Sequence, residues 1–162
     1  MEYTVEKVRR QDRLLDRQRA LEILEQGEYG VLSMRSENGE GAYGIPLSYV
    51  WDQQSALYIH CAPEGRKLAC IAACPEVSFC VVGRTNVVAE KFTTGYESIV
   101  LRCTARYSLP EEERRTALEL FVHKYCPGHE SVGKVYAAQS FHRTEILRLD
   151  IETMSGKTKK LF

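Results

Sequence analysis

The segment EILRLDIETM, residues 145–154, alternates apolar and polar side chains more regularly than any other part of the chain. Successive side chains of a β-strand point to opposite faces, so this alternation predicts a strand with one buried and one exposed face. Its apolar positions are Leu147, Leu149 and Ile151. The backbone groups of such a strand must pair with other strands, so the fold has to be built on a sheet.

Five other segments have the composition of strands and are bounded by turn residues. They cover residues 28–36, 42–52, 55–62, 76–84 and 96–108. The first three are joined by short turns and are expected to form an antiparallel meander. The second contains Gly44 and Pro46, and a proline without a backbone donor is expected at a sheet edge or a bulge. Residues 86–95 are expected to be partly strand and partly loop.

Helical signals lie between and beside these strands. They cover residues 17–26, 65–74, 108–125 and 131–140. Asp16 is expected to cap the first helix, which ends at Gly27. Ser108 and Glu111 are expected to form a capping box at the start of the third helix.

This order of elements predicts a mainly β (α+β) fold, a six-stranded antiparallel barrel with peripheral helices. The sequence shows no internal repeat, low-complexity tract or linker, so residues 1–162 are expected to form one domain. Residues 1–15 are expected to form an N-terminal arm, and residues 155–162 a polar tail.

Composition narrows the classes of function. Of the 162 residues, 44% are hydrophobic, enough for a core. The 22 basic and 22 acidic residues balance, so nucleic acid is not expected as a partner. The start of the chain has no secretory pattern and no apolar run is long enough to span a bilayer, so we expect a cytoplasmic protein without a membrane partner. Its six cysteines would then be mostly reduced.

The segment YIHCAPEGRK, residues 58–67, has the strongest signal for a binding site. It leads from a predicted strand through Gly65 into a predicted helix whose first residues are Arg66 and Lys67. Cations in a first helical turn oppose the helix dipole unless an anion compensates them. The free amides of that turn also bind anions, so a phosphate site and an ordinary charged loop are both open interpretations.

Two other segments are weaker candidates. In AYGIPLSYV, the glycine and proline suggest that the backbone leaves the sheet ladder and turns its polar groups to a ligand, although an ordinary edge bulge is the more common explanation of such a segment. In TTGYESIVLRC, Ser98 offers a hydroxyl that more often faces solvent. Metal binding is not expected. Cys70 and Cys74 lack a second ligand pair, and the HKYCPGH segment is interpreted as the end of a helix.

The order of motifs is similar to that of a known family. The motifs GIPLSY, LYIHCAxEGRK, CPEVSF, YxSIV and MSGK follow one another between residues 27 and 157. Together they resemble the pyridoxamine 5'-phosphate oxidase-like flavoproteins, and most of all their nitroimidazole-resistance (Nim-type) branch. The resemblance implies a split β-barrel homodimer with FMN in a cleft between the subunits; FAD remains an alternative.

The resemblance also implies roles for particular residues. Arg66 and Lys67 would hold the FMN phosphate, and Gly65 would allow its close approach. Ser98 would also help to bind FMN, from the predicted strand at residues 96–108. The flavin and its ribityl chain would be lined by Ile45, Pro46, Leu47, Ser48, His60 and Ala62.

The function implied is an FMN-dependent reduction of a small planar acceptor, such as a nitroaromatic, by NAD(P)H. No Rossmann fingerprint is present, so the nicotinamide would dock only transiently. His60 is the candidate catalytic acid because its side chain exchanges protons near neutral pH. The end of the chain lacks the RLxP motif of the oxidase branch, so pyridoxamine-phosphate oxidation is not expected. A non-catalytic flavin- or haem-binding module is the alternative function.

Overall fold

The computed structural model describes residues 1–6 and 8–161 of the chain. Its helices are α1 (Arg17–Gln26), α2 (Arg66–Ala73), α3 (Glu111–Tyr125) and α4 (Glu130–Ser140). Its strands are β1 (Glu2–Tyr3), β2 (Tyr29–Arg35), β3 (Ala42–Ser48), β4 (Val50–Trp51), β5 (Ala56–Cys61), β6 (Glu76–Val88), β7 (Thr93–Arg106) and β8 (Glu145–Lys159). Short 3₁₀ helices cover Gln11–Arg13, Ala89–Lys91 and Phe141–Arg143.

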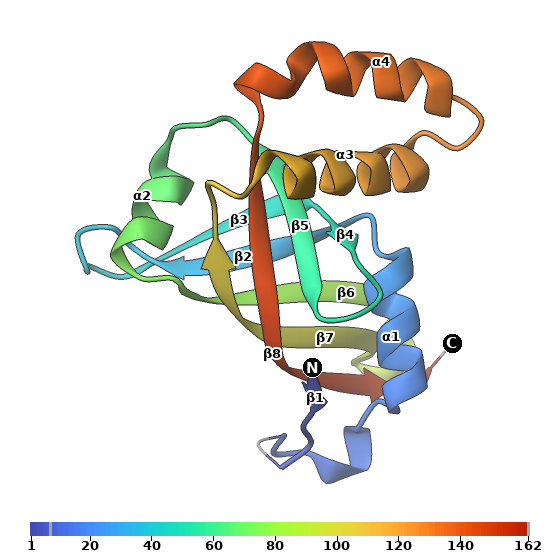
Figure 1. Ribbon diagram of the computed structural model, residues 1–162. Coiled ribbons are helices and arrows are strands. Elements are labelled where there is room, and N and C mark those ends of the chain that lie inside the picture. Colours follow the sequence, from blue (N-terminus) through green and yellow to red (C-terminus); the bar gives the residue numbers. More distant parts are fainter. Residues whose placement is uncertain (7, 162) are drawn as a thin grey trace.

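The strands of the described residues form one strongly curved sheet with the order β3-β2-β6-β7-β8-β5-β4. Neighbouring strands in this order are antiparallel, while β1 pairs with β8 in parallel. The sheet wraps round its core until β3 approaches β5, and the helices lie at its periphery (Figure 1). The expected split barrel is confirmed, with eight strands rather than six in the part of the chain described.

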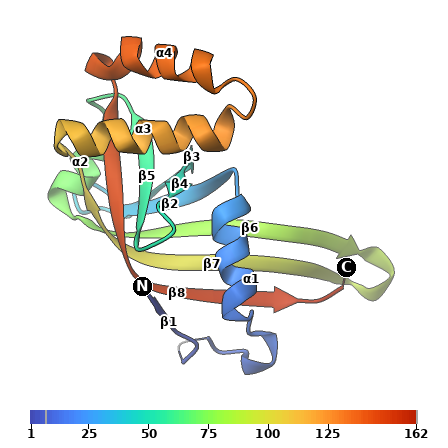
Figure 2. The ribbon, with the colours of Figure 1, turned by 45° about the vertical axis from the view of Figure 1, so that its right-hand side comes forward.

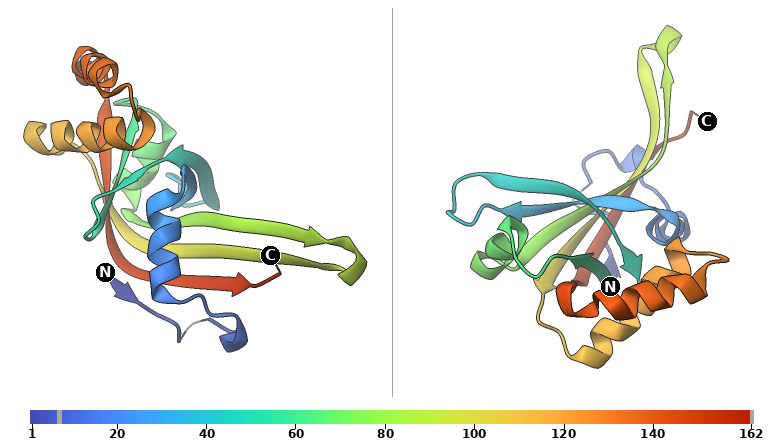
Figure 3. Two further views of the ribbon diagram at one scale, coloured as in Figure 1. Left: turned by 90° about the vertical axis from the view of Figure 1, so that its right-hand side faces the viewer. Right: turned by 90° about the horizontal axis from the view of Figure 1, so that it is seen from above.

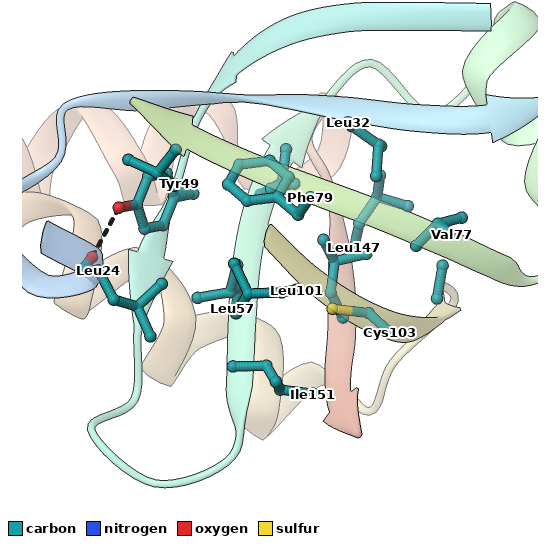
Figure 4. Packing of buried hydrophobic residues seen from close by; sticks show 14 of the residues in the cluster. Leu24, Leu32, Tyr49, Leu57, Val77, Phe79, Leu101, Cys103, Leu147 and Ile151 are labelled. Carbon is teal, nitrogen blue, oxygen red and sulfur yellow. Dashed lines mark hydrogen bonds between the residues drawn. The ribbon is translucent and has the colours of Figure 1, made fainter. Parts of the chain in front are cut away.

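The core fills the inner face of this sheet (Figure 4). Leu57, Phe79 and Leu101 are fully buried there, because alternate residues of their strands point inward. Helix α1 contributes Leu24 to the same cluster. The hydroxyl of Tyr49, also fully buried, donates a hydrogen bond of 2.6 Å to the carbonyl oxygen of Leu24, which satisfies this polar group inside the core.

Tyr49 also explains why the expected strand 42–52 is two strands. The chain leaves the sheet at this residue, between β3 and β4, and turns its ring inward against Phe79 with the centroids 5.1 Å apart. A fully buried aromatic anchor there outweighs the strand propensity of the segment.

Strand β3 is an edge strand, as the proline predicted. Every residue of β3 nevertheless pairs in regular register with β2, including Pro46 opposite Val31. The expectation that the backbone leaves the ladder is therefore wrong. Proline is accommodated because the outer edge of β3 has no neighbouring strand in the described residues.

Strands β6 and β7 extend beyond the barrel as a hairpin (Figures 2 and 3). Residues 86–95 lie in it, partly as strand and partly as the short 3₁₀ turn Ala89–Lys91, as expected. Strand β8 accompanies the hairpin as far as Lys159, so the polar tail expected at 155–162 is wrong for residues 155–159. That segment contains no large apolar residue because its buried positions include Gly156, where an added Cβ would lie 2.9 Å from Leu15.

Described residues at both ends of the expected N-terminal arm are tied to β8. Glu2 and Tyr3 pair with Thr153 and Met154. Leu15 is 2% exposed, and its N–H donates to the carbonyl oxygen of Gly156 at 3.2 Å. The segment expected as an arm therefore contributes to the sheet and to its core.

The two predicted helix caps differ in outcome. Asp16 caps α1 as expected, since its carboxylate accepts from the Arg19 N–H at 2.8 Å. The Ser108 capping box is wrong: α3 begins after Pro110 without a side-chain cap, and Ser108 has a φ of +57°. This left-handed backbone turns the chain before the helix begins, so Ser108 lies outside its first turn.

Helices α3 and α4 lie outside the barrel, one above the other near the ends of β5 and β8 (Figure 1). Ser140 is the buried residue of α4. In the described part of the chain, every helix is too short or too polar to cross a lipid bilayer.

Candidate functional site

The turn from β5 into α2 has the backbone geometry of an open anion site. Gly65 has φ +122° and ψ 173°, a region in which side-chain-bearing residues are strained. A Cβ added to Gly65 would meet no atom within 4 Å, so the space above the turn is open. The first amides of α2 lie directly behind it and have no carbonyl partner within the helix. We name residues Gly65–Lys67 the cation turn.

Arg66 has partners in the turn between β2 and β3 and on β3 itself. Its guanidinium lies 3.2 Å from the Glu37 carboxylate, donates to the Ser36 hydroxyl at 3.1 Å and stacks 4.6 Å from the ring centre of Tyr43. The Glu37 backbone amide, the Cys70 thiol and Arg66 together lower the pKa of the Glu37 carboxyl to about 2. Arg66 is therefore positioned at the edge of β3, with one carboxylate as its counter-ion.

Lys67 and Cys61 lie on the other side of the cation turn. Burial raises the pKa of the Cys61 thiol, and the charge of Lys67 together with a hydrogen bond from it opposes this rise. Lys67 thus faces the end of β5, while Arg66 faces β2 and β3. The two adjacent cations are directed to different sides of the turn.

The predicted flavin-lining residues of β3 alternate in exposure. Ile45 and Leu47 are partly buried against the core, while Pro46 and Ser48 are exposed. Among the described residues, the strand pairs on one side only, with β2. Its other edge therefore presents unpaired backbone groups in a row, interrupted at Pro46, which offers a carbonyl but no N–H.

A groove with a cavity volume of about 900 Å³ opens between the ends of β3 and β5 and helices α3 and α4. We name it the helix groove. It brings together three of the predicted site residues, Ser48, His60 and Ala62. Its remaining lining comes mainly from the two helices and the segment after them: Cys61, Leu118, Phe121, Val122, Tyr125, Cys126, His129, Val132, Gly133, Tyr136, Ala137, Ser140, Arg143 and Thr144.

His60 lies in the helix groove with its ring edge-to-face against Phe121, at 4.7 Å between centroids. The surroundings partly bury the imidazole and lower its pKa below the usual 6.5. This burial favours the neutral ring over the imidazolium, and in the neutral ring one nitrogen is a donor and the other an acceptor.

Ser98 does not join the other predicted residues within one protomer. His60 pairs with Ile146 of β8, whereas Ser98 pairs with Lys157. At about 3.3 Å per residue, these two positions of β8 are roughly 36 Å apart along the strand. Ser98 lies on the outer face of the sheet, beside the exposed Val100 two residues further along β7.

The sequence reasoning did not identify the α3 wall of the helix groove. Lys124 donates hydrogen bonds to the carbonyl oxygens of Gly27 at 2.7 Å and Tyr49 at 3.1 Å, and its ammonium lies 4.2 Å from the Tyr49 ring centre. The Tyr125 hydroxyl lies 2.6 Å from the Glu28 carbonyl oxygen. Burial lowers the pKa of Lys124 to about 8. The aromatic spacing of Phe121 and Tyr125 was visible in the sequence, but it is typical of core packing.

The other side-chain clusters offer no metal centre. Within residues 1–6 and 8–161, no three His, Cys, Asp or Glu side chains are arranged to hold a metal ion. The thiols of Cys70 and Cys74 instead lie near the carboxylates of Glu37 and Glu76.

Comparison with known proteins identifies the family. A family model described as pyridoxamine 5'-phosphate oxidase matches residues 16–158, and the chain belongs to this family. No curated protein matches the chain.

Solved structures are similar to this chain at low sequence identity. A candidate 5-nitroimidazole antibiotic resistance protein from Bacteroides thetaiotaomicron is 19% identical, with a TM-score of 0.72, covering 90% of this chain and 86% of that one. An FAD- and haem-binding protein from Mycobacterium smegmatis is 17% identical, with a TM-score of 0.77 and coverage of 91% and 73%. An FAD-binding protein from Mesorhizobium loti is 23% identical, with a TM-score of 0.62 and coverage of 91% and 98%. At these identities the likeness establishes the fold.

Proposed function

We propose that the chain is an FMN-binding oxidoreductase that acts as a homodimer and reduces a small planar acceptor, such as a nitroaromatic, with NAD(P)H. The proposal depends on one observation: the cation turn, the free edge of β3 and the groove containing His60 meet at the same end of β5. Two of the similar structures are described as FAD-binding proteins, which favours a flavin as the occupant.

The cation turn fits the phosphate of FMN. The open space above Gly65 admits an anion close to the first amides of α2. The Arg66–Glu37 pair is exposed to solvent on both sides, and such screened pairs contribute little to stability. A phosphate can therefore displace Glu37 from Arg66 at little cost and gain a charge-assisted hydrogen bond.

The free edge of β3 fits the flavin ring. The outward backbone groups of Ile45–Ser48, of which Pro46 offers only its carbonyl, provide donors and acceptors in one plane for the polar rim of the ring. Ser48 and Ala62 line the groove at its β-strand end, next to His60.

When bound, FMN would supply a ring that takes a hydride from NAD(P)H and passes two electrons to the acceptor. Reduction of a nitro group to a nitroso group consumes two electrons and two protons and releases water. We propose that His60, once protonated from solvent to its imidazolium form, delivers one of these protons at the groove side of the ring. A His60→Ala variant is expected to retain FMN and lose turnover; unchanged turnover would exclude this role.

The homodimer is proposed to form on the outer face of the sheet. Strand pairing places Pro46, Val31, Cys80, Val100 and Ser155 in one row across five strands of that face. Val100 is 45% exposed and Val82 is 60% exposed, so this face has apolar surface that a second copy would bury. A partner bound there would also bring its own Ser98 toward the flavin, which one protomer alone does not do. Sedimentation of a Val100→Lys variant tests this: a monomer is expected, and an unchanged dimer would place the interface elsewhere.

Flavin binding is tested by the absorption spectrum of the purified protein, with mass identification of the released chromophore to distinguish FMN from FAD. In a Arg66→Ala/Lys67→Ala variant, FMN affinity is expected to fall at least tenfold, because hydrogen bonds to charged groups contribute about 1.5–3 kcal/mol. The matched control is an Arg9→Ala/Arg10→Ala variant, which removes another pair of adjacent cations at a position distant in sequence from the cation turn. Equal affinity in both variants would overturn the phosphate assignment.

The alternative is a non-catalytic flavin- or haem-binding module. It is favoured by the apolar helix groove with His60 and His129, two side chains able to ligate a haem iron. A yellow protein that nicotinamides do not reduce would support the module, and a Soret band that is lost in a His129→Ala variant would support haem.

A further inference from the structure

The helix groove has apolar walls that no described part of the chain covers. Val132 and Tyr136 of α4 line it and are 67% and 65% exposed. Phe121 and Tyr125 of α3 form the other wall, with their rings stacked at 5.8 Å between centroids. Aromatic side chains of both helices therefore line the space between α3 and α4, which we name the slot and which suits flat, apolar groups.

The charges of the helix groove favour an anion. Among the described residues that line it, none is an aspartate or glutamate, and Arg143 is the one with a permanent positive charge. The neighbouring Arg114, by contrast, already has partners for its guanidinium. It donates to the carbonyl oxygens of Phe141 and Thr144 and lies 3.9 Å from the Glu145 carboxylate. Within the described residues, Arg143 makes no ion pair with these or any other carboxylates.

We propose that the helix groove binds a planar aromatic carboxylate of two or more rings, with its carboxylate on Arg143 and its rings in the slot between α3 and α4. This inference rests on the proposed function for the role of the ligand, which would be the acceptor of the electrons. The end of the ligand remote from its carboxylate lies beside His60. The assignment to a carboxylate follows from the single permanent cation and the sparse polar lining. A phosphate monoester, with about two charges, would require more donors.

A ligand explains the groove better than a second copy of the chain. Arg143 precedes by three residues Ile146, the strand partner of His60, so the groove holds a cation and an imidazole a short way apart beside the apolar side chains of α3 and α4. This is the arrangement of a pocket that fixes one elongated molecule in one orientation. Its volume of about 900 Å³ also accommodates several rings. The outer face of the sheet already offers a separate surface for dimerisation.

The test is calorimetric binding of 6-nitro-2-naphthoate and of its neutral isostere 6-nitro-2-naphthamide to the purified full chain, whose flavin content is measured by absorbance. The carboxylate is expected to bind at least tenfold more tightly than the amide. An Arg143→Gln variant is expected to lose this preference. A Lys134→Gln variant removes a cation from α4 outside the groove and is expected to retain it. Equal binding of the two compounds, or an unchanged preference in Arg143→Gln, would overturn the proposal.

A second variant tests whether the groove binds a ligand or a second copy of the chain. Tyr136→Ser is expected to weaken naphthoate binding without changing the sedimentation coefficient; dissociation of an oligomer with no effect on the ligand would identify the groove as a subunit interface and overturn the proposal. Charge-selective binding to a protein that carries no flavin would leave this site standing and reject the proposed oxidoreductase. A flavin-loaded protein without charge selectivity would reject this site alone.

Discussion

The cation turn and the helix groove lie at the same end of β5 but satisfy their charges in opposite ways. Arg66 in the cation turn has a carboxylate, a hydroxyl and an aromatic ring as partners. Arg143 in the helix groove has no described carboxylate partner. A ligand at the turn must therefore replace an existing counter-ion, whereas a ligand in the groove adds one. We infer that the turn selects for strong anions and the groove for molecules with large apolar surface.

The largest expected effect comes from removing part of the apolar wall of the helix groove. Phe121 is 6% exposed and contacts both His60 and Tyr125. A Phe121→Ala variant is expected to lose about 3 kcal/mol of unfolding free energy in urea titrations, the lower end for buried aromatic truncations because the groove already admits water. Its His60 pKa, followed by NMR, should rise toward 6.5 as the ring becomes hydrated. A His60 pKa that stays unchanged would mean that Phe121 does not exclude water from it.

Substitution of one glycine in each region measures the backbone strain in the cation turn and beside the helix groove. Gly65 in the turn and Gly128 beside the groove both have positive φ, +122° and +78°, and an added Cβ meets nothing within 4 Å at either. Only the Gly65 conformation is nearly restricted to glycine, so Gly65→Ala should cost about 2–3 kcal/mol and Gly128→Ala about 1 kcal/mol. Chemical denaturation of both variants measures the difference. Equal costs would show that the turn relaxes without strain.

Lys124, which lies behind the helix groove, is expected to make the free energy of unfolding depend on pH. Burial lowers its pKa from 10.5 to about 8, so between pH 8 and 10.5 the unfolded chain binds more protons than the folded one. Stability conferred by this group should therefore rise with pH across that window, by on the order of 1–2 kcal/mol after allowance for its partial exposure. Lys124→Met should remove this slope from the difference between the two urea-unfolding profiles. A parallel pair of profiles would contradict the buried ammonium.

The smallest expected effect is at the counter-ion of the turn. Glu37→Gln removes the carboxylate that a phosphate must displace, so FMN affinity should rise about two- to fivefold, as expected for a half-exposed ion pair. Naphthoate binding in the groove should not change. An unchanged FMN affinity would mean that Arg66 keeps its place beside Glu37 when the phosphate binds.

Local patterns predicted much of the barrel. Alternation located β8, the cap of α1 followed from Asp16, and Pro46 predicted an edge strand. The polar end of β8 was missed because its buried positions hold small or polar residues, whose side chains give no apolar signal. Ser108 was misjudged because its left-handed backbone depends on how the chain turns out of β7.

The sequence by itself determined the strands, the helices and the adjacent cations of the cation turn, because each depends on residues close together in the chain. Only the tertiary structure decided that Arg66 has Glu37 as its counter-ion, that Ser98 lies far along β8 from His60, and that α3 and α4 enclose a groove. These facts depend on the register of strands and the packing of helices that are distant in sequence. Such contacts are selected by the burial of the whole core, which no single segment encodes.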